Sequence, residues 1–132
     1  MAQAQGVTGG VRLVLRLEGL AAFVVAVLLY RHLGGSWVWW AVLLLTPDLS
    51  MLGYLAGPRI GALSYNIAHS YLGPAALAGL ALAGGPAWAG LGAAIWVAHI
   101  GADRMLGFGL KYVDGFGFTH LGRVGRAATV AA

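Results

Sequence analysis

The sequence predicts an all-α polytopic membrane protein: an antiparallel four-helix transmembrane bundle followed by a glycine- and aromatic-rich cytoplasmic segment. Hydrophobic residues make up 60% of the 132 residues and charged residues only 9%, whereas soluble domains carry roughly 25% charged residues. Four apolar segments, each of about the 17–25 residues that cross a bilayer core, follow one another along the chain. Because only short Gly/Pro breaks separate them, successive helices should run antiparallel.

The expected elements follow from these segments and breaks. We expect helices at residues 13–30, 37–55, 62–82 and 87–106, within a transmembrane domain of residues 11–106. The breaks between them are Gly34-Gly35-Ser36, Gly57-Pro58-Arg59 and Gly84-Gly85-Pro86. Residues 1–10 and 123–132 are expected to be disordered, and residues 107–122 to form an ordered cytoplasmic cap segment. The first segment contains Glu18 and lacks a small-residue cleavage site, so we expect a retained helix rather than a signal peptide.

Prolines lie inside two of the expected helices, Pro47 in the second and Pro74 in the third. A proline has no backbone N–H, so each predicts a kink that leaves a carbonyl group to be satisfied by a neighbour. Pro47, beside Asp48, either widens the bundle at this point or reflects only the general frequency of proline in membrane helices.

Basic residues lie beside the apolar segments rather than in one patch, which argues against a nucleic-acid partner. Most flank the side that holds both termini: Arg12, Arg16, Arg59, Arg104, Lys111, Arg123 and Arg126. The opposite side has Arg31 and the tryptophan-rich starts of the second and fourth helices. The positive-inside rule and the interfacial preference of tryptophan therefore predict an inner-membrane protein with both termini in the cytoplasm and the lipid bilayer as its surroundings.

Each apolar segment also contains polar residues, and ionisable groups inside a membrane mark a site hypothesis because they are costly there. Asp48, His69 and His99 should lie at a similar depth in the cytoplasmic half, given a rise of about 1.5 Å per residue. Asp103 follows His99 by four residues and shares its helical face. Glu18 lies one to two turns inside the first helix and is expected in the same layer.

Two interpretations of this layer remain open. Asp48, His69, His99 and Asp103 offer two nitrogen and two oxygen ligands, which suit a divalent ion and Zn²⁺ above all. Glu18 would then be a catalytic carboxylate beside an ion that activates water, or it would only hydrogen-bond its neighbours. In the other interpretation the same side chains form a metal-free hydrogen-bonded network that fixes how the helices pack.

Further residues are expected to support this layer or to contact a substrate: Tyr54, Tyr65, Asn66, Arg104, Lys111, Tyr112 and His120. Tyr65 and Asn66 lie about one turn before His69 and can orient its ring. Lys111 is expected to contact anionic lipids, or to bind a substrate phosphate or headgroup together with His120. Cysteine is absent, which excludes disulfides and thiolate chemistry.

Five phrases of the sequence together resemble a small bacterial integral-membrane family of unknown function. They are residues 47–54 (PDLSMLGY), 65–69 (YNIAH), 99–104 (HIGADR), 109–112 (GLKY) and 119–122 (THLG). The resemblance runs from Leu17 to Arg123 and implies a four-helix membrane protein without an assigned activity. The pairing of Pro47-Asp48 with His69 and His99 is also similar to membrane-bound metal-dependent hydrolases, which implies hydrolytic chemistry.

Three functions are therefore consistent with the sequence. The first is a metal-dependent hydrolase that acts on a membrane-associated lipid or small molecule. The second is a small transporter or proton/ion pathway with Glu18 in a chain of titratable groups, and the third is a structural membrane protein. Small residues one turn apart, Ala75 with Gly79 and Gly90 with Ala94, favour close helix contacts and leave a homo-oligomer open.

Overall fold

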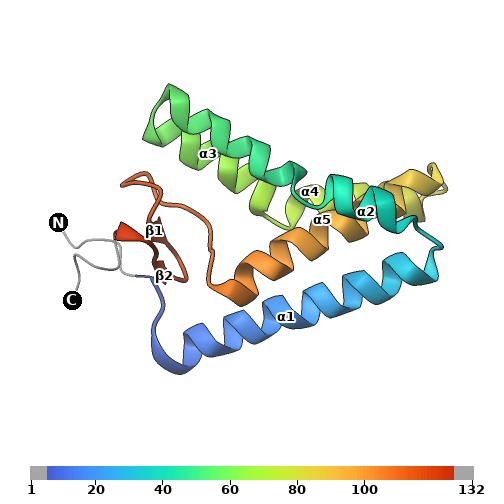
Figure 1. Ribbon diagram of the computed structural model, residues 1–132, viewed down its shortest axis with the longest axis horizontal. Helices are drawn as coiled ribbons and strands as arrows, with labels where there is room; N and C mark the ends of the chain where they lie inside the picture. Colours follow the sequence, from blue (N-terminus) through green and yellow to red (C-terminus); the bar gives the residue numbers. More distant parts are fainter. Residues whose placement is uncertain (1–5, 127–132) are drawn as a thin grey trace.

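The computed structural model describes residues 6–126, and this part of the chain is mostly helical, as predicted (Figure 1). Its elements are α1 (Gly9–His32), α2 (Trp37–Leu43), the 3-10 helix η1 (Thr46–Ala56), α3 (Pro58–His69), α4 (Leu72–Leu82), α5 (Ala87–Leu106), β1 (Phe118–Thr119) and β2 (Gly122–Arg123). The two strands pair antiparallel, with Phe118 opposite Arg123 and Thr119 opposite Gly122.

The four expected helices correspond to α1, to α2 with η1, to α3 with α4, and to α5. Two of these helical segments, Gly9–His32 and Trp37–Ala56, are long and apolar enough to cross a membrane. Predicted disorder at residues 1–5 and 127–132 lies outside the described residues. Within them, Gly9 and Gly10 already belong to α1 and Arg123 belongs to β2, so order extends beyond both predicted limits.

The second helical segment changes from α-helix to 3-10 helix just before Pro47: α2 ends at Leu43 and η1 begins at Thr46. Proline cannot donate to the carbonyl four residues earlier, which here belongs to Leu43. The Thr46 hydroxyl donates to that Leu43 carbonyl instead, at 2.7 Å. The predicted kink and its neighbouring hydrogen bond are therefore both present, and Asp48 lies in the first turn of η1 just after the break.

The third helical segment also breaks before a proline, Pro74, which cannot donate to the carbonyl of Ser70. Ser70 leaves the helix with ψ of 152°, so α3 ends at His69. Hydropathy alone predicted one continuous helix over residues 62–82. The break instead places His69 at a helix end, where its backbone carbonyl can accept hydrogen bonds from other elements.

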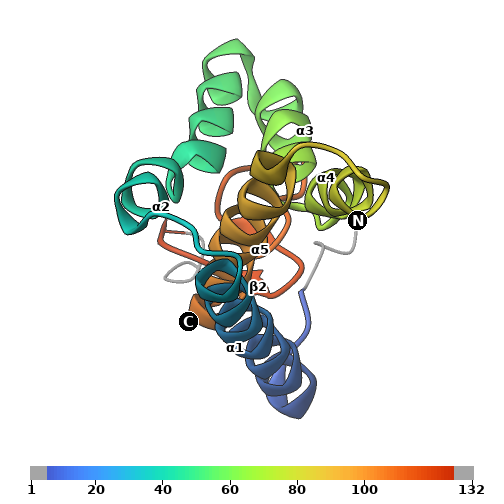
Figure 2. The same ribbon diagram turned by 90° about the vertical axis from the view of Figure 1, so that its right-hand side faces the viewer.

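Helix α5 lies in the middle of the structure, with α1 packed along one side and α4 along another, while η1 packs against α3 (Figures 1 and 2). Gly19 of α1 and Gly101 of α5 allow the two helices to pack closely, because a Cβ on Gly101 would lie 2.7 Å from the Gly19 carbonyl oxygen. Asp103 is close to His99 around the helix axis, whereas Gly101 lies on roughly the opposite side at about 100° per residue. The surface of α5 that bears His99 and Asp103 is therefore not the one packed on α1.

The η1–α3 pair diverges from the α1–α5 pair, and the chain after α5 runs between them (Figure 1). The turn begins at Gly107, whose φ of 95° is readily adopted only by glycine. The N–H of Val7 donates to the His120 carbonyl at 2.8 Å, which ties the start of α1 to the cap segment. The cap segment, residues 107–122, thus contacts the residues just before α1, and through Lys111 it also hydrogen-bonds to Asn66 of α3.

Candidate metal centre

Four side chains from three helices converge at one point: Asp48 from η1, His69 from α3, and His99 and Asp103 from α5. One possible ligand atom from each residue lies within 4.8 Å of the other three. The sequence placed these residues at a similar depth, and the structure brings them into contact.

Five of the six distances among these four ligand atoms are close to those of a coordination shell. The two histidine Nε2 atoms are 3.0 Å apart. Asp48 Oδ1 lies 3.2 Å from Nε2 of His69 and 3.3 Å from that of His99. Asp103 Oδ2 lies 3.4 Å from each of the same nitrogens. Four ligands bound tetrahedrally to Zn²⁺ at about 2.0–2.2 Å are separated from one another by about 3.3–3.6 Å. These five separations therefore match, or fall slightly below, the edges of a zinc tetrahedron.

Burial divides the cluster into a floor and a rim. The side chains of His69 and His99 are 2% and 3% exposed, whereas those of Asp48 and Asp103 are 33% and 20% exposed. The imidazoles thus form the buried floor and the carboxylates the accessible rim. A further ligand or a substrate atom would reach the centre from the carboxylate side.

The protonation of His69 follows from its second ring nitrogen. Nδ1 lies 2.9 Å from the Tyr65 carbonyl, which can only accept, so Nδ1 carries the proton. Nε2 of the neutral ring then presents a lone pair to His99 Nε2 and to two carboxylates. Electron-rich atoms in such contact require a cation or a shared proton among them. In the metal-bound interpretation this is the metal cation, and in the metal-free interpretation it is a shared proton.

Two side chains of α5 fix the end of α3 that bears His69. Trp96 Nε1 donates to the Ala68 carbonyl at 2.6 Å, and the Arg104 guanidinium donates to the His69 carbonyl at 2.9 Å. The last carbonyls of a helix have no partner inside it, so these bonds satisfy groups that would otherwise be buried unpaired. They also hold His69 at a fixed position relative to His99 on the same helix.

Tyr65 and Asn66 connect the cluster to the cap segment. The Tyr65 ring stacks on the His69 ring with centroids 3.7 Å apart, and its hydroxyl donates to Asp103 Oδ2 at 3.4 Å. The Asn66 side chain donates to the Lys111 carbonyl at 2.8 Å and accepts from the Lys111 N–H at 2.7 Å. Tyr65 therefore orients two members of the cluster, whereas Asn66 orients Lys111 rather than His69.

Lys111 is buried beside the cluster, with 4% of its surface exposed. Its ammonium lies 3.7 Å from the Phe116 ring centroid and 4.8 Å from that of Tyr65. Burial lowers the pKa of Lys111 to about 8, although the nearby Asp103 and Asp48 favour its charged form. Its ammonium is thus still mostly protonated at neutral pH.

The other predicted residues lie further out. The buried Tyr54 hydroxyl has no hydrogen-bond partner among the described residues, and its ring packs edge-on against Phe116 at 5.5 Å. Tyr112 is exposed. His120 Nδ1 accepts the Leu110 N–H at 2.9 Å, and burial together with nearby Arg104 lowers the pKa of His120.

Glu18, predicted as the catalytic carboxylate of this layer, is not brought to the cluster. It is exposed and lines a separate cavity of about 310 Å³, together with Leu15, Gly19, Ala22, Tyr71, Arg104 and His120. The physical reason is helix rotation. Gly19, the neighbour of Glu18, packs against Gly101 and Arg104 rather than against the His99 side of α5. A similar depth in the sequence therefore does not bring Glu18 to the same place.

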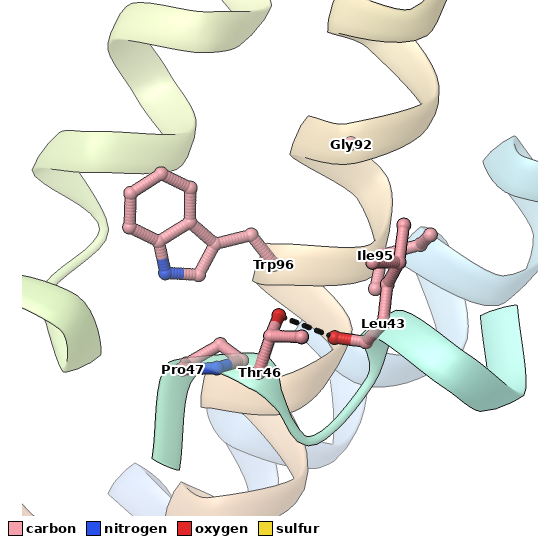
Figure 3. Close-up of a pocket in the computed structure, with 6 residues that line it drawn as sticks. All are labelled: Leu43, Thr46, Pro47, Gly92, Ile95 and Trp96. Atoms are coloured by element: carbon pink, nitrogen blue, oxygen red, sulfur yellow. Dashed lines mark hydrogen bonds between the residues drawn. The ribbon is translucent and has the colours of Figure 1, made fainter. Parts of the chain in front are cut away.

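An apolar cavity of about 260 Å³ lies where α2 breaks (Figure 3). It is lined by Leu43, Thr46, Pro47, Gly92, Ile95 and Trp96. Pro47 directly precedes Asp48, and Trp96 lies about one turn before His99. The cavity therefore lies next to the backbone that carries two of the four possible ligands.

A family model described as a domain of unknown function, DUF4260, matches residues 12–124. The chain belongs to the DUF4260 family. The match contains the whole cluster and agrees with the resemblance to a family of unknown function. No curated protein and no solved structure matches the chain significantly. The DUF4260 match adds nothing to the weaker resemblance to membrane-bound hydrolases.

Sequence reasoning missed two residues of this DUF4260 site. Trp96 was not singled out, although it holds the end of α3 and lines the apolar cavity. Phe116 was predicted only as part of the aromatic cap segment, and it contacts both Tyr54 and Lys111. The spacing of Trp96 three residues before His99 was the available signal for the first, because such residues are neighbours on a helix.

Proposed function

We propose that this protein is an integral membrane protein that binds one divalent metal ion, with Zn²⁺ the best fit, and hydrolyses a membrane-associated substrate. The observation that carries the proposal is the cluster of two buried imidazole nitrogens, 3.0 Å apart, and two carboxylates that each lie 3.2–3.4 Å from both nitrogens. A divalent ion would balance both the facing lone pairs and the two negative charges.

The outer surface of α1 supports the membrane location. Its exposed large apolar residues include Leu13, Val14, Leu17, Val24, Val25 and Leu28. Soluble monomers rarely expose continuous apolar patches of this kind, and lipid is the solvent that tolerates them. The helical segment Trp37–Ala56 is the second one that is long and apolar enough to span a membrane. We extend this to four spans with both termini in the cytoplasm, because the loop charges favour that topology.

The division into floor and rim suits catalysis more than a purely structural ion. A bound divalent ion supplies Lewis acidity, either to a water molecule or to the substrate oxygen. His69 and His99 hold the buried side, and the partly exposed Asp48 and Asp103 leave the opposite side accessible. The Tyr65 hydroxyl, by donating to Asp103, keeps this carboxylate in position at the rim.

The apolar cavity beside Pro47 and Trp96 supports a substrate with an apolar part. Its lining is almost entirely hydrocarbon, with the Thr46 hydroxyl already bonded to the Leu43 carbonyl (Figure 3). We propose that an alkyl chain of the substrate enters this cavity while its reactive group lies at the cluster. The ion-pathway alternative is less well supported, because Glu18 lies in a separate cavity.

Metal analysis of the detergent-purified protein tests the proposal. We expect about one zinc per chain in the wild type, and a loss of zinc in His69→Ala and His99→Ala. His32→Ala removes an exposed histidine at the end of α1 and serves as the matched control, with zinc unchanged. A wild type that refolds with no metal after incubation with zinc would instead favour the metal-free network.

A further inference from the structure

We propose that Lys111 makes the site selective for a substrate that carries a phosphate group, and that this phosphate binds between Lys111 and the metal cluster. This inference rests on the proposed metal function and names its substrate class. Three observations carry it: the fixed position of Lys111, the lack of an anionic partner, and the charge that remains when the cluster holds a divalent ion.

Lys111 is held in place from both sides. Its backbone makes two hydrogen bonds with the Asn66 side chain, at 2.7 and 2.8 Å, and it pairs as an antiparallel bridge with Thr119. These bonds fix the backbone from which the side chain extends, and burial against the Phe116 and Tyr65 rings limits the freedom of the ammonium. Less entropy is then lost when the ammonium binds a ligand.

The Lys111 ammonium has no ion pair and no hydrogen bond within residues 6–126. Its contacts are the faces of Phe116 and Tyr65, which attract a cation but do not accept its three N–H donors as an anion would. Tyr65 in turn stacks on His69 and donates to Asp103. The Tyr65 ring therefore contacts both the ammonium and the cluster.

Charge balance indicates that the ligand beside Lys111 carries a negative charge. The two carboxylates of the cluster neutralise one divalent ion and leave none for Lys111. The other buried cation, Arg104, bonds the His69 carbonyl and lines the same cavity as Glu18. Lys111 is thus a buried positive charge near the site that has, within residues 6–126, neither a counter-ion nor a hydrogen-bond acceptor once the metal is bound. An anion at the rim would remove this imbalance, which is costly in a buried place.

Phosphate suits this pair of groups because a lysine ammonium acts on it as a point charge while the metal binds another oxygen. The group can belong to free phosphate or to a lipid headgroup. The experiment therefore uses inorganic phosphate, the short-chain lipid dihexanoylphosphatidylglycerol, and acetate as a carboxylate probe. Each is titrated calorimetrically into the zinc-loaded, detergent-solubilised full chain.

We expect Lys111→Met to weaken the binding of phosphate or of the lipid by roughly tenfold or more, the factor of a charged hydrogen bond of about 1.5 kcal/mol. Lys111→Arg should retain most of the affinity. Arg59→Met, which removes an exposed cation from the first turn of α3, should change neither probe. Zinc content should stay the same in all variants. Lys111→Gln is the second neutral variant if Lys111→Met does not fold.

The outcomes separate this inference from the metal proposal. Normal zinc content with unchanged phosphate and lipid affinity in Lys111→Met overturns the role of Lys111 alone. A wild type without zinc overturns both, because Lys111 then serves as counter-ion to the free carboxylates. Binding of the lipid but not of free phosphate supports a headgroup substrate, and the reverse supports a soluble phosphate. If acetate binds the wild type as tightly as phosphate does, and Lys111→Met weakens both equally, the choice of phosphate is overturned.

Discussion

On one face of α5, His99 and Asp103 meet two more ligand-type side chains from η1 and α3, whereas on the other face Arg104 shares a cavity with Glu18. Both faces carry ionisable groups inside apolar helices. They differ in charge balance: the first collects two carboxylates and two ring nitrogens, whereas one carboxylate and one guanidinium line the cavity on the second. Only the first arrangement calls for an added cation, so its groups are better candidates for a metal site than Glu18 is.

The largest effect should come from removing one rim carboxylate. We expect Asp103→Asn to weaken zinc binding by more than about 100-fold, beyond the roughly 10–100-fold loss typical of a residue that only supports a ligand. Glu18→Gln is the matched change on the other face and should leave zinc affinity unaltered. Competition with a zinc chelator measures both. Equal losses in the two variants would erase the proposed difference between the faces.

The Gly101 contact separates stability from metal binding. A side chain at Gly101 would press on the Gly19 carbonyl and on the backbone of Phe23, so Gly101→Leu should destabilise the fold by about 1–3 kcal/mol. Gly79→Leu, at an exposed glycine with no atom within 4 Å of an added Cβ, should cost nothing. Thermal unfolding in detergent measures the difference. Zinc affinity of the folded Gly101→Leu fraction should be retained, since the opposite face is unchanged.

How far the sequence predicts this molecule depends on the property in question. Helix α5 agrees with its predicted range, Ala87–Leu106, because Gly/Pro breaks bound the apolar segment on one side and Gly107 ends it on the other. The helical segments that contain Pro47 and Pro74 are each divided in two. A hydropathy pattern does not indicate where a helix breaks or that it continues as a 3-10 helix. The ends of α5 were thus easier to predict than the breaks inside the other helical segments.

The site shows the same limit at the level of side chains. Asp48, His69, His99 and Asp103 converge as expected, because similar depth and the four-residue spacing on α5 constrain them. Glu18 was expected at the same depth, but the rotation of α1 about its axis directs it elsewhere. That rotation depends on the close contact of Gly19 with Gly101. Phe116 reaches Lys111 only because the cap segment folds back, and this depends on tertiary contacts such as the Asn66 hydrogen bonds.

A smaller effect should follow from loosening the end of α3. Trp96→Phe keeps an aromatic ring but removes the N–H that bonds the Ala68 carbonyl, so His69 should be held less firmly. We expect zinc affinity to fall about tenfold, the lower range for a residue that supports a ligand. Trp88→Phe, at an exposed position near the start of α5, is the control. An unchanged affinity in Trp96→Phe would show that the cluster does not depend on this bond.

The smallest predicted effect concerns the apolar cavity beside the cluster. Leu43→Trp should fill part of the space that we assign to a substrate alkyl chain, whereas Leu45→Trp changes an exposed residue that does not line it. Acetohydroxamate and octanohydroxamate bind zinc through the same group and differ in chain length. Leu43→Trp should weaken the longer probe about fourfold, as expected for one excluded methylene of about 0.8 kcal/mol, and leave the shorter probe unaffected.

The two hydroxamates also control for partition into detergent, because wild type and variants are compared in the same micelles. Equal weakening of both probes would mean that Leu43→Trp disturbs the zinc site itself rather than the cavity. No weakening of either would place the alkyl chain elsewhere on the protein. A selective loss of the longer probe in Leu43→Trp, absent in Leu45→Trp, would connect the break at Pro47 to function: the same interruption that positions Asp48 would also open the space for the substrate.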